Sequence, residues 1–306
     1  MTGASGPSTG VAVVTGATGG MGRVIAAALA GRGMHVVAVV RDPARAAELG
    51  RQIGRGPGSL EVIRADLATR AGLTAAAAAI AGGHGAITVL VNNAGAHYPE
   101  RRLSPDGVEM HVAVNHLAPY GLTVLLDRQL RRGRARVVNV ASDALRDTRR
   151  VKLLGAPRPA TIDPADLQDL TRINPAEGFV PFEAYARAKL LSVTAGYGLA
   201  RALAADGVTV NAVHPGIVAT GIVDDLVPKV LRPSAGLVRR FLLTPEEGAA
   251  ATLRLATDPT LEGVTGRYYV RDAEAVTPPV TYDRDVQRRL RDATERILAP
   301  EGFRSL

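Results

Sequence analysis

The sequence contains no cysteine and no tryptophan, and aromatic residues make up only 4% of its 306 positions. Without cysteine the chain can form no disulfide, thiolate nucleophile or zinc–cysteine site. It also has no apolar run of about 18 residues, so no membrane-spanning helix is expected. Met1–Gly10 has neither the basic nor the apolar region of a secretory signal peptide. These absences predict a soluble, cytoplasmic protein.

Lysine is scarce as well, since only Lys152, Lys189 and Lys229 occur, and the formal net charge of +8 comes from arginine. The densest basic stretch, Arg131–Lys152, has no interleaved aromatic residues of the kind that stack on nucleic-acid bases. We interpret it as a solvated surface and expect no nucleic-acid partner. The six histidines show no metal-ligand spacing along the chain, so no metal is expected.

Short valine-rich runs alternate with longer helical patterns along the whole chain. Strands are expected at Val11–Val14, His35–Val40, Leu60–Ile63, Thr88–Val91, Arg136–Val140, Val208–Val213 and Arg267–Val270. Helices are expected at Val24–Ala30, from Pro43 onward, and at Ala71–Ala81, Gly107–Leu130, Glu183–Ala204 and Pro245–Ala256. Continuous apolar runs indicate strands that are buried on both faces. The sequence therefore predicts an α/β fold with one doubly wound (Rossmann) parallel sheet.

No repeat or flexible linker divides the chain, so residues 1–306 are expected to form a single dinucleotide-binding catalytic domain. Three segments fall outside the alternation: an insertion at 143–182, a segment at 217–243 in the position of a substrate lid, and a C-terminal extension at 273–306. Five prolines argue against one long helix in the insertion. It is either a wall of the substrate pocket or a surface excursion. The apolar residues of 217–243 form either a lid or a core or oligomer contact.

A glycine-rich turn, Thr15–Gly22, lies between the first strand and the first helix. Its glycines allow the backbone to approach a pyrophosphate, and the helix that begins near Gly20 directs free N–H groups toward it. A tight connection without a ligand is the alternative. The loop residues expected to contact a dinucleotide are Gly16, Thr18, Gly20, Met21 and Gly22.

The end of the second strand distinguishes the two nicotinamide dinucleotides. An acidic residue there would bind the ribose 2′-hydroxyl of NAD. This chain has Arg41, which can pair with the 2′-phosphate of NADP, followed by Asp42. The sequence therefore favours NADP over NAD, and the alternative is a solvated arginine at a strand end.

Four further motifs follow in a fixed order. They are Asn92-Asn93-Ala94-Gly95, Asn115, Ser142 after the fifth strand, and Tyr185-x-x-x-Lys189. Together with the glycine loop, this set resembles the short-chain dehydrogenase/reductase family over about residues 11–270. Asp106–Leu117 and the helical pattern Arg288–Leu298 resemble its retinol-dehydrogenase-like branch.

Tyr185 and Lys189 are four residues apart, so they share one face of a helix. An isolated tyrosine has a pKa of about 10, so it is a poor acid–base catalyst at neutral pH. A nearby cation favours the phenolate and is therefore expected to lower that pKa. The resemblance implies that Tyr185 donates a proton to a carbonyl oxygen and that Ser142 binds the same oxygen. It also implies that Lys189 holds the nicotinamide ribose and that Asn115 positions a water that relays protons to Lys189.

The resemblance also extends the list of cofactor residues. It implies contacts from Asp66, Leu67, Asn93, Ala94, Gly95, Tyr185, Lys189, Pro215, Gly216, Val218 and Thr220. Asn93 is expected near the adenosine ribose, whereas Asn92 is expected to cap nearby backbone. Asp66 has a second interpretation as a helix N-cap. Ser142 and Tyr185 lie 43 positions apart, an interval longer than in most family members.

The expected activity is NADP-dependent interconversion of a ketone or aldehyde and an alcohol, on a small-molecule substrate that is large and apolar. Family habit implies a homodimer or homotetramer. One alternative is a catalytically silent NADP-binding regulatory protein, although such proteins usually lose the tyrosine or the lysine. Another is a dinucleotide-dependent epimerase or dehydratase.

Overall fold

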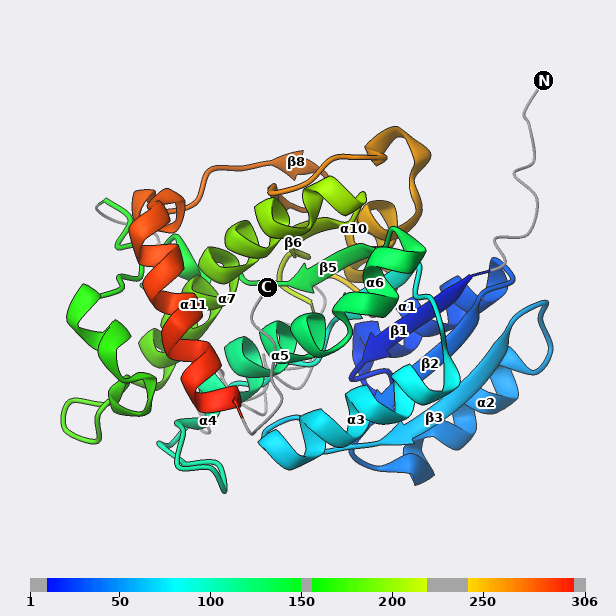
Figure 1. The fold of residues 1–306 in the computed structure, drawn as a ribbon, viewed down its shortest axis with the longest axis horizontal. Helices are drawn as coiled ribbons and strands as arrows, with labels where there is room; N and C mark the ends of the chain where they lie inside the picture. Colours follow the sequence, from blue (N-terminus) through cyan, green and yellow to red (C-terminus); the bar gives the residue numbers. More distant parts are fainter. Residues whose placement is uncertain (1–9, 150–155, 219–241, 300–306) are drawn as a thin grey trace.

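The computed structural model describes residues 10–149, 156–218 and 242–299 and contains one eight-stranded sheet (Figure 1). The strand order is β3-β2-β1-β4-β5-β6-β7-β8. The strands are β1 (Val11–Thr15), β2 (His35–Val40), β3 (Ser59–Arg64), β4 (Val89–Asn92), β5 (Arg136–Val140), β6 (Thr209–His214), β7 (Tyr268–Val270) and β8 (Ala273–Glu274). The first seven strands in this order, from β3 through β2, β1, β4, β5 and β6 to β7, all pair in parallel with their neighbours. This arrangement confirms the doubly wound fold. The two-residue edge strand β8 is antiparallel to β7 and was not expected.

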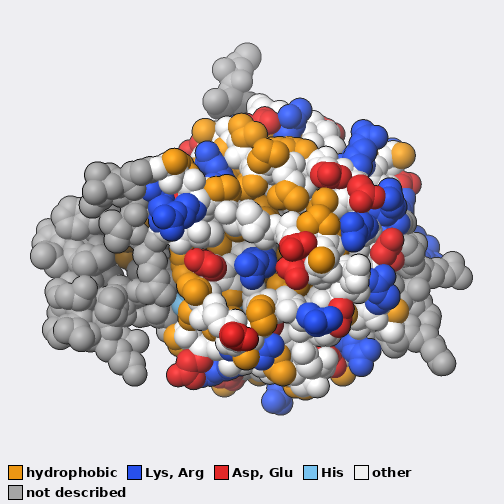
Figure 2. Space-filling model, turned by 90° about the vertical axis from the view of Figure 1, so that its left-hand side faces the viewer, with side chains coloured by type: hydrophobic (Ala, Val, Ile, Leu, Met, Phe, Trp, Pro, Cys, Tyr) orange, Lys and Arg blue, Asp and Glu red, His pale blue; other side chains and the backbone are white. Residues whose placement is uncertain are grey.

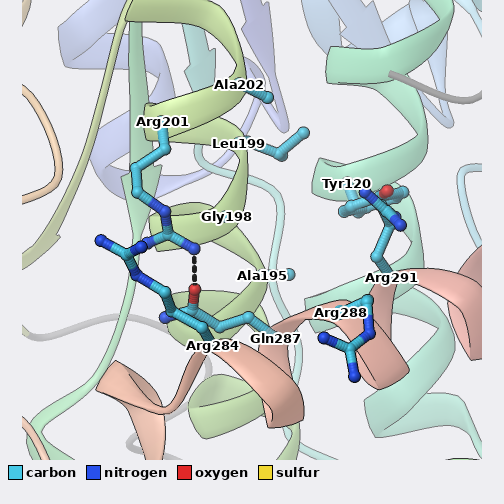
Figure 3. A pocket seen from close by; sticks show the side chains of 10 residues that line it. All are labelled: Tyr120, Ala195, Gly198, Leu199, Arg201, Ala202, Arg284, Gln287, Arg288 and Arg291. Atoms are coloured by element: carbon cyan, nitrogen blue, oxygen red, sulfur yellow. Dashed lines mark hydrogen bonds between the residues drawn. The ribbon is translucent and has the colours of Figure 1, made fainter.

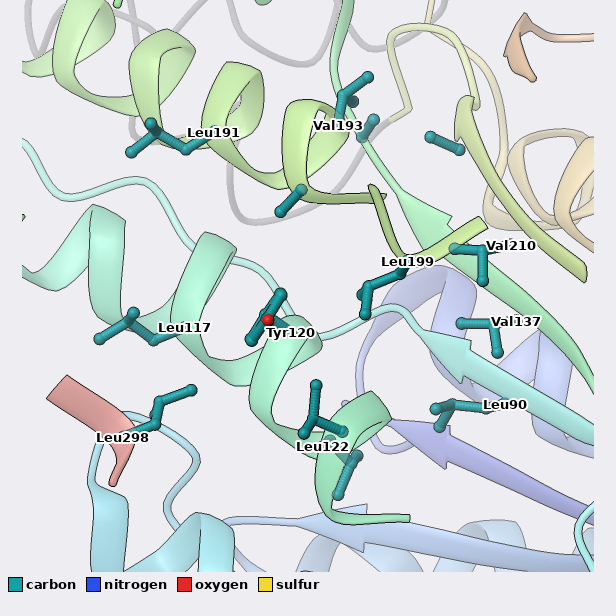
Figure 4. Packing of buried hydrophobic residues seen from close by; sticks show 14 of the residues in the cluster. Leu90, Leu117, Tyr120, Leu122, Val137, Leu191, Val193, Leu199, Val210 and Leu298 are labelled. Atoms are coloured by element: carbon teal, nitrogen blue, oxygen red, sulfur yellow. The ribbon is translucent and has the colours of Figure 1, made fainter. Parts of the chain in front are cut away.

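Helices cover both faces of the sheet. They are α1 (Gly20–Gly31), α2 (Ala46–Ile53), α3 (Arg70–Gly83), α4 (Met110–Val112), α5 (Ala118–Leu125), α6 (Asp127–Gly133), α7 (Pro181–Leu203), α10 (Pro245–Thr257) and α11 (Arg284–Leu298). Buried side chains of α1, α2 and α10 form the core on one face, whereas those of α3, α5, α6, α7 and α11 form the core on the other. Figure 4 shows part of the second core, where Leu90 and Val137 of the strands meet Leu122 of α5 and Leu199 of α7.

The helical stretch expected at Gly107–Leu130 is interrupted. Between α4 and α5 the chain forms one π-helical turn, η2 (Ala113–Leu117), and a further break separates α5 from α6. Within the π turn, the side chain of Asn115 donates a hydrogen bond of 3.1 Å to the carbonyl of His111, four residues earlier. Single π turns inside helices are frequently found at functional sites.

The described part of the insertion contains three short 3₁₀ turns, in agreement with its prolines, before α7 begins at Pro181: η3 (Asp143–Leu145), η4 (Pro164–Gln168) and η5 (Leu170–Arg172). Other short turns are η1 (Pro43–Arg45), η6 (Ala204–Asp206), η8 (Pro259–Leu261) and η9 (Pro279–Tyr282). In the C-terminal extension, α11 packs against α7 and η4. Most of the segment 217–243 lies outside the described residues.

Several arginines of the basic stretch 131–152 form ion pairs. Arg131 pairs with Asp127 and Asp206, and Arg149 pairs with Asp147. On the face of the molecule shown in Figure 2, basic and acidic side chains are interspersed.

Among the described residues, none of the helices combines the length and apolar character that crossing a bilayer requires.

Candidate active site

The predicted catalytic residues converge at the carboxyl edge of the sheet. Ser142 lies two residues after the end of β5, and Tyr185 and Lys189 lie in the first three turns of α7, which packs against β5 and β6. Because parallel strands end at one edge, the residues after β1, β4 and β5 come together there although they are distant in sequence.

Tyr185 and Lys189 are buried, and Ser142 beside them is partly exposed. Tyr185 is only 6% exposed, and its hydroxyl lies within hydrogen-bonding reach of the Ser142 hydroxyl. Lys189 is 4% exposed, its Nζ donates a hydrogen bond of 2.8 Å to the Val140 carbonyl, and it lies 5.8 Å from the centre of the Tyr185 ring. The end of β5 thus anchors the lysine beside the tyrosine.

Burial controls the ionisation of both groups. It raises the pKa of Tyr185 to about 12, although the hydrogen bond with Ser142 acts in the opposite direction. Burial also lowers the pKa of Lys189 to about 8. The expectation that the pKa of Tyr185 is lowered is therefore wrong, because loss of hydration outweighs a cation 5.8 Å from the centre of its ring.

Asn115 lies next to this cluster. A Cβ atom placed on Gly95 would lie 3.0 Å from Oδ1 of Asn115 and 3.2 Å from Nζ of Lys189, so both polar groups crowd over that glycine. The Asn115 side chain also exchanges two hydrogen bonds with the backbone of Ala96, at 2.9 and 3.1 Å. The π turn thus holds Asn115 against the loop that follows β4.

The glycine loop has the shape of a phosphate cradle. Gly16 has a φ of +66°, and a Cβ on Gly22 would lie 2.2 Å from the Gly16 carbonyl oxygen, so a side chain at residue 22 does not fit. The N-cap residue of α1, Gly19, provides no capping side chain. The first N–H groups of α1 are therefore available to an anion, and Thr18 and Met21 flank them in sequence.

The side chain of Asn93 supports this loop, and its expected place near the adenosine ribose stays a prediction. Its Nδ2 donates to the carbonyls of Thr15 and Gly16 at 3.0 and 3.4 Å. Ala94 donates its backbone N–H to the Thr15 side chain at 2.9 Å. Asn92 donates at 2.9 Å to the side chain of Asn139 on β5, in addition to a longer bond to a backbone carbonyl.

Arg41 and Asp42 have different environments at the end of β2. The Asp42 carboxylate accepts a hydrogen bond from Ala44 and caps η1. Arg41 is exposed and has no ion pair with the described part of the chain. The Asp42 carboxylate is thus occupied as a helix cap, whereas the Arg41 guanidinium is available to an anionic ligand.

Asp66 also has a local role, although the N-cap of α3 is Thr69 rather than Asp66. Asp66 is exposed and accepts a hydrogen bond of 3.0 Å from Ala68, and Leu67 beside it packs partly into the core. Pro215 and Gly216 follow β6, and Val218 is buried. Thr220 lies outside the described residues.

Sequence reasoning missed a buried network beside Tyr185. Glu109 and His111 are both fully buried, and Nδ1 of His111 lies 2.8 Å from Oε1 of Glu109. Nε2 of His111 accepts the backbone N–H of Tyr98 at 2.9 Å, so Nδ1 is the donor to Glu109. The ring centres of His111 and Tyr185 are 6.2 Å apart.

The insertion completes this network. Asn174 is 3% exposed and donates a hydrogen bond of 2.9 Å to Oε2 of Glu109. Burial opposes ionisation of Glu109, but the hydrogen bonds from His111 and Asn174 outweigh it and lower the pKa of Glu109 below its ordinary value. The Glu-x-His pattern in the sequence does not predict this network, because its third member, Asn174, lies 65 positions from Glu109.

Nearer the tyrosine, the ring of His97 lies edge-on to Tyr185 at 5.8 Å, and Phe182 stacks at 6.4 Å. Phe179 of the insertion lies 6.2 Å from His111. Part of the insertion therefore lies against the residues that surround Tyr185.

A separate cavity of about 300 Å³ lies between α5, α7 and α11 (Figure 3). Four arginines line it, and Arg201 donates a hydrogen bond to Gln287 across it. It involves the C-terminal half of α7, whereas Tyr185 and Lys189 lie in the N-terminal half. The cavity is therefore distinct from the catalytic cluster.

Comparison with known proteins agrees with this geometry. Residues 10–151 match the family described as short chain dehydrogenase, and residues 170–273 match the family described as enoyl-(acyl carrier protein) reductase. The chain is 33% identical to mouse retinol dehydrogenase 14 over 92% of its length and 84% of that protein's. It is 36% identical to mouse polyprenol dehydrogenase over 92% of its length and 81% of that protein's.

A similar solved structure is an NAD(P)-dependent gluconate 5-dehydrogenase from Beutenbergia cavernae, described with bound NADP at low occupancy. It is 28% identical, covers 87% of this chain and 98% of its own, and has a TM-score of 0.65. The glycine cradle and the Ser–Tyr–Lys cluster are thus accompanied by similarity over nearly the whole chain. This protein belongs to the short-chain dehydrogenase/reductase family, in its retinol-dehydrogenase-like branch, and is an NAD(P)-dependent oxidoreductase.

Proposed function

We propose that the protein uses NADP(H) to interconvert a large, apolar ketone or aldehyde and the corresponding alcohol. The observation that carries this proposal is the convergence of the buried Tyr185 and Lys189 with the partly exposed Ser142 at the edge of the sheet that also holds the glycine cradle. The exposed Arg41 supports NADP, because the neighbouring acid Asp42 is engaged as a cap.

The residues present fit a dinucleotide. The backbone of Gly16 to Gly22 and the uncapped start of α1 would hold the pyrophosphate, because the first N–H groups of that helix have no capping side chain. Arg41 would pair with the 2′-phosphate, and Lys189 would hold the nicotinamide ribose. When bound, the nicotinamide supplies or accepts a hydride at the substrate carbon.

In the reducing direction, Tyr185 donates its phenolic proton to the carbonyl oxygen. Its pKa of about 12 keeps the phenol protonated at neutral pH, which suits a proton donor. The Ser142 hydroxyl orients the same oxygen, since it already lies within reach of the Tyr185 hydroxyl. Lys189, charged below its pKa of about 8, stabilises the phenolate that proton donation creates. Asn115, beside Lys189, positions the water through which the proton is replaced.

Glu109 and His111 act as positioning residues that hold the wall beside Tyr185, and the insertion contributes to that wall through Asn174 and Phe179. The apolar substrate class is supported by the phenylalanine rings near Tyr185 and His111, and by relatives named for retinol and polyprenol.

The direct test is a substrate panel with purified protein and NADPH, in which cofactor consumption is measured for long-chain and ring-bearing aldehydes and for small polar carbonyls. The proposal expects turnover and a kcat/KM that rises with apolar surface. Turnover of small polar carbonyls alone would contradict the proposed substrate class. Product formation without net NADPH consumption would instead indicate an epimerase or dehydratase.

A further inference from the structure

A second cluster of ligating side chains lies at the amino edge of the sheet, away from the catalytic cluster. His35 is the first residue of β2, Glu61 lies within β3, and His84 is the C-cap residue of α3. The catalytic cluster lies at the carboxyl edge, beyond the opposite ends of the strands. The mechanism uses none of these three residues.

The ligand atoms of this cluster already converge. Nε2 of His84 lies 2.9 Å from Oε2 of Glu61, and Nε2 of His35 lies 3.4 Å from the same oxygen. If one ligand atom is taken from each residue, the three atoms all lie within 4.8 Å of one another. All three side chains are partly exposed, so an ion from solvent can reach them.

The sheet holds two of the three ligands in place. His35 is paired in register with Ser59, and Glu61 lies two residues after Ser59, so it is on the same face of β3. The Ser59 hydroxyl lies 2.6 Å from Nδ1 of His35, which directs the other ring nitrogen, Nε2, toward Glu61. A hydrogen bond on the non-ligating nitrogen is the usual outer-shell support of a metal-bound histidine.

We propose that His35, Glu61 and His84 bind a divalent transition-metal ion, with Zn²⁺ as the ion of choice for testing. Two imidazoles and one carboxylate form a ligand set that Zn²⁺ accepts, with water in the remaining position. Bonds of about 2.0–2.2 Å in a tetrahedron place ligand atoms roughly 3.3 Å apart. The two histidine nitrogens lie 2.9 and 3.4 Å from Oε2 of Glu61, and the three ligand atoms all lie within 4.8 Å of one another, so side-chain movements alone can bring them to these separations.

Binding would join the C-terminus of α3 to the edge of the sheet. β3 is the outermost strand on that side and pairs only with β2 among the strands of the described chain. The ion would therefore stabilise this edge without taking part in hydride transfer. The site is invisible in the sequence, because its neighbouring ligands are 26 and 23 positions apart.

The test uses the full-length protein without an affinity tag, treated with EDTA and then dialysed into chelator-free buffer near neutral pH. Zn²⁺ binding is measured by isothermal titration calorimetry and by thermal unfolding. The proposal expects one saturable equivalent and a rise of several degrees in Tm at a Zn²⁺ concentration of about 100 times Kd.

His84→Gln and Glu61→Gln should weaken binding by more than about 100-fold, since loss of an outer-shell partner alone costs about 10–100-fold. Ser59→Ala should weaken it by that smaller factor and leaves all three ligands in place. Glu48→Gln, an exposed acid on α2 paired with Arg51, is the control and should bind like the parent.

Absence of saturable binding, or equal binding by the parent and all three cluster variants, would overturn the proposal. NADPH-dependent activity of the zinc-free protein is measured in parallel and is expected to be unchanged in every variant. A protein that does not bind Zn²⁺ would therefore leave the proposed catalytic function unaffected. A protein without NADPH-dependent activity would still give a valid Zn²⁺ titration.

Discussion

The side-chain amide of Asn174 donates a hydrogen bond of 2.9 Å to Glu109, which connects the insertion to a fully buried carboxylate. The other oxygen of that carboxylate accepts a hydrogen bond from Nδ1 of His111. The centres of the His111 and Tyr185 rings are 6.2 Å apart. A buried carboxylate is costly unless its oxygens are paired. The side-chain oxygen of Asn174 also accepts a hydrogen bond of 2.5 Å from Arg187 of α7, so the insertion, the Glu109–His111 pair and the catalytic helix form one hydrogen-bonded unit.

Removal of the Asn174 side chain should weaken this unit. Asn174 has a φ of +60°, so Asn174→Gly deletes the amide without adding backbone strain. We expect a loss of about 1–3 kcal/mol in the free energy of unfolding, because Glu109 loses a buried donor and Arg187 loses its acceptor. Urea denaturation measures this loss, and Glu177→Gly at an exposed position of the insertion is the control. Equal stability of the two variants would show that the side-chain bonds of Asn174 to Glu109 and Arg187 contribute nothing.

Tyr185→Phe should remove the proton donor and preserve the ring. We expect kcat to fall by about 10²–10⁴-fold, the usual contribution of a positioned acid. The Kd of NADPH, measured by fluorescence titration, should remain close to that of the parent. Tyr197→Phe is the control, because Tyr197 lies on the same helix with its hydroxyl 3.0 Å from Thr277. A fully active Tyr185→Phe variant would exclude the assigned role.

Arg41→Ala should reduce the preference for NADPH. Loss of a charge-assisted hydrogen bond costs about 1.5–3 kcal/mol, so the ratio of the kcat/KM values for NADPH and NADH should fall by about 10–100-fold. Steady-state kinetics with both cofactors measure this ratio. Arg45→Ala, an exposed arginine of the next turn, is the control. If the ratio is the same in Arg41→Ala as in the parent, the 2′-phosphate is bound elsewhere.

Gly22→Ala should impair the phosphate cradle, because the added Cβ would lie 2.2 Å from the Gly16 carbonyl oxygen. We expect at least about tenfold weaker NADPH binding, since the backbone of the loop must shift to relieve this contact. Gly19→Ala provides a matched control, as nothing lies within 4 Å of its Cβ position. Calorimetric titration with NADPH compares the two variants. Equal affinities in both would place the pyrophosphate away from this loop.

The depressed pKa of Lys189 predicts a pH dependence. Its ammonium is present below a pKa of about 8 and is lost as the pH rises through that value. Because kcat/KM for NADPH reports the free enzyme, it should be level below about pH 8 and then decrease by up to tenfold per unit. Lys189→Arg keeps its charge and should lose this inflection even if its activity is lower. A decrease that persists unchanged in this variant would assign the inflection to another group.

The alternation of elements was predictable because strands buried on both faces leave continuous apolar runs. β2 and β5 have the bounds that their valine-rich runs predict. The two-residue strand β8 leaves no such run, since both of its residues are exposed at the sheet edge. The π turn was missed because helical periodicity does not register a single inserted residue.

The sequence by itself determined the order of the strands and helices, the glycine turn, and the identity of the serine, tyrosine and lysine, because these depend on local periodicity and on short spacings. Only the tertiary structure decided that burial, rather than the neighbouring cation, sets the pKa of Tyr185. It likewise decided that Asn174 reaches Glu109 and that His35 meets His84 around Glu61. Hydration and contacts between distant segments exist only after the chain has folded, so no local pattern can encode them.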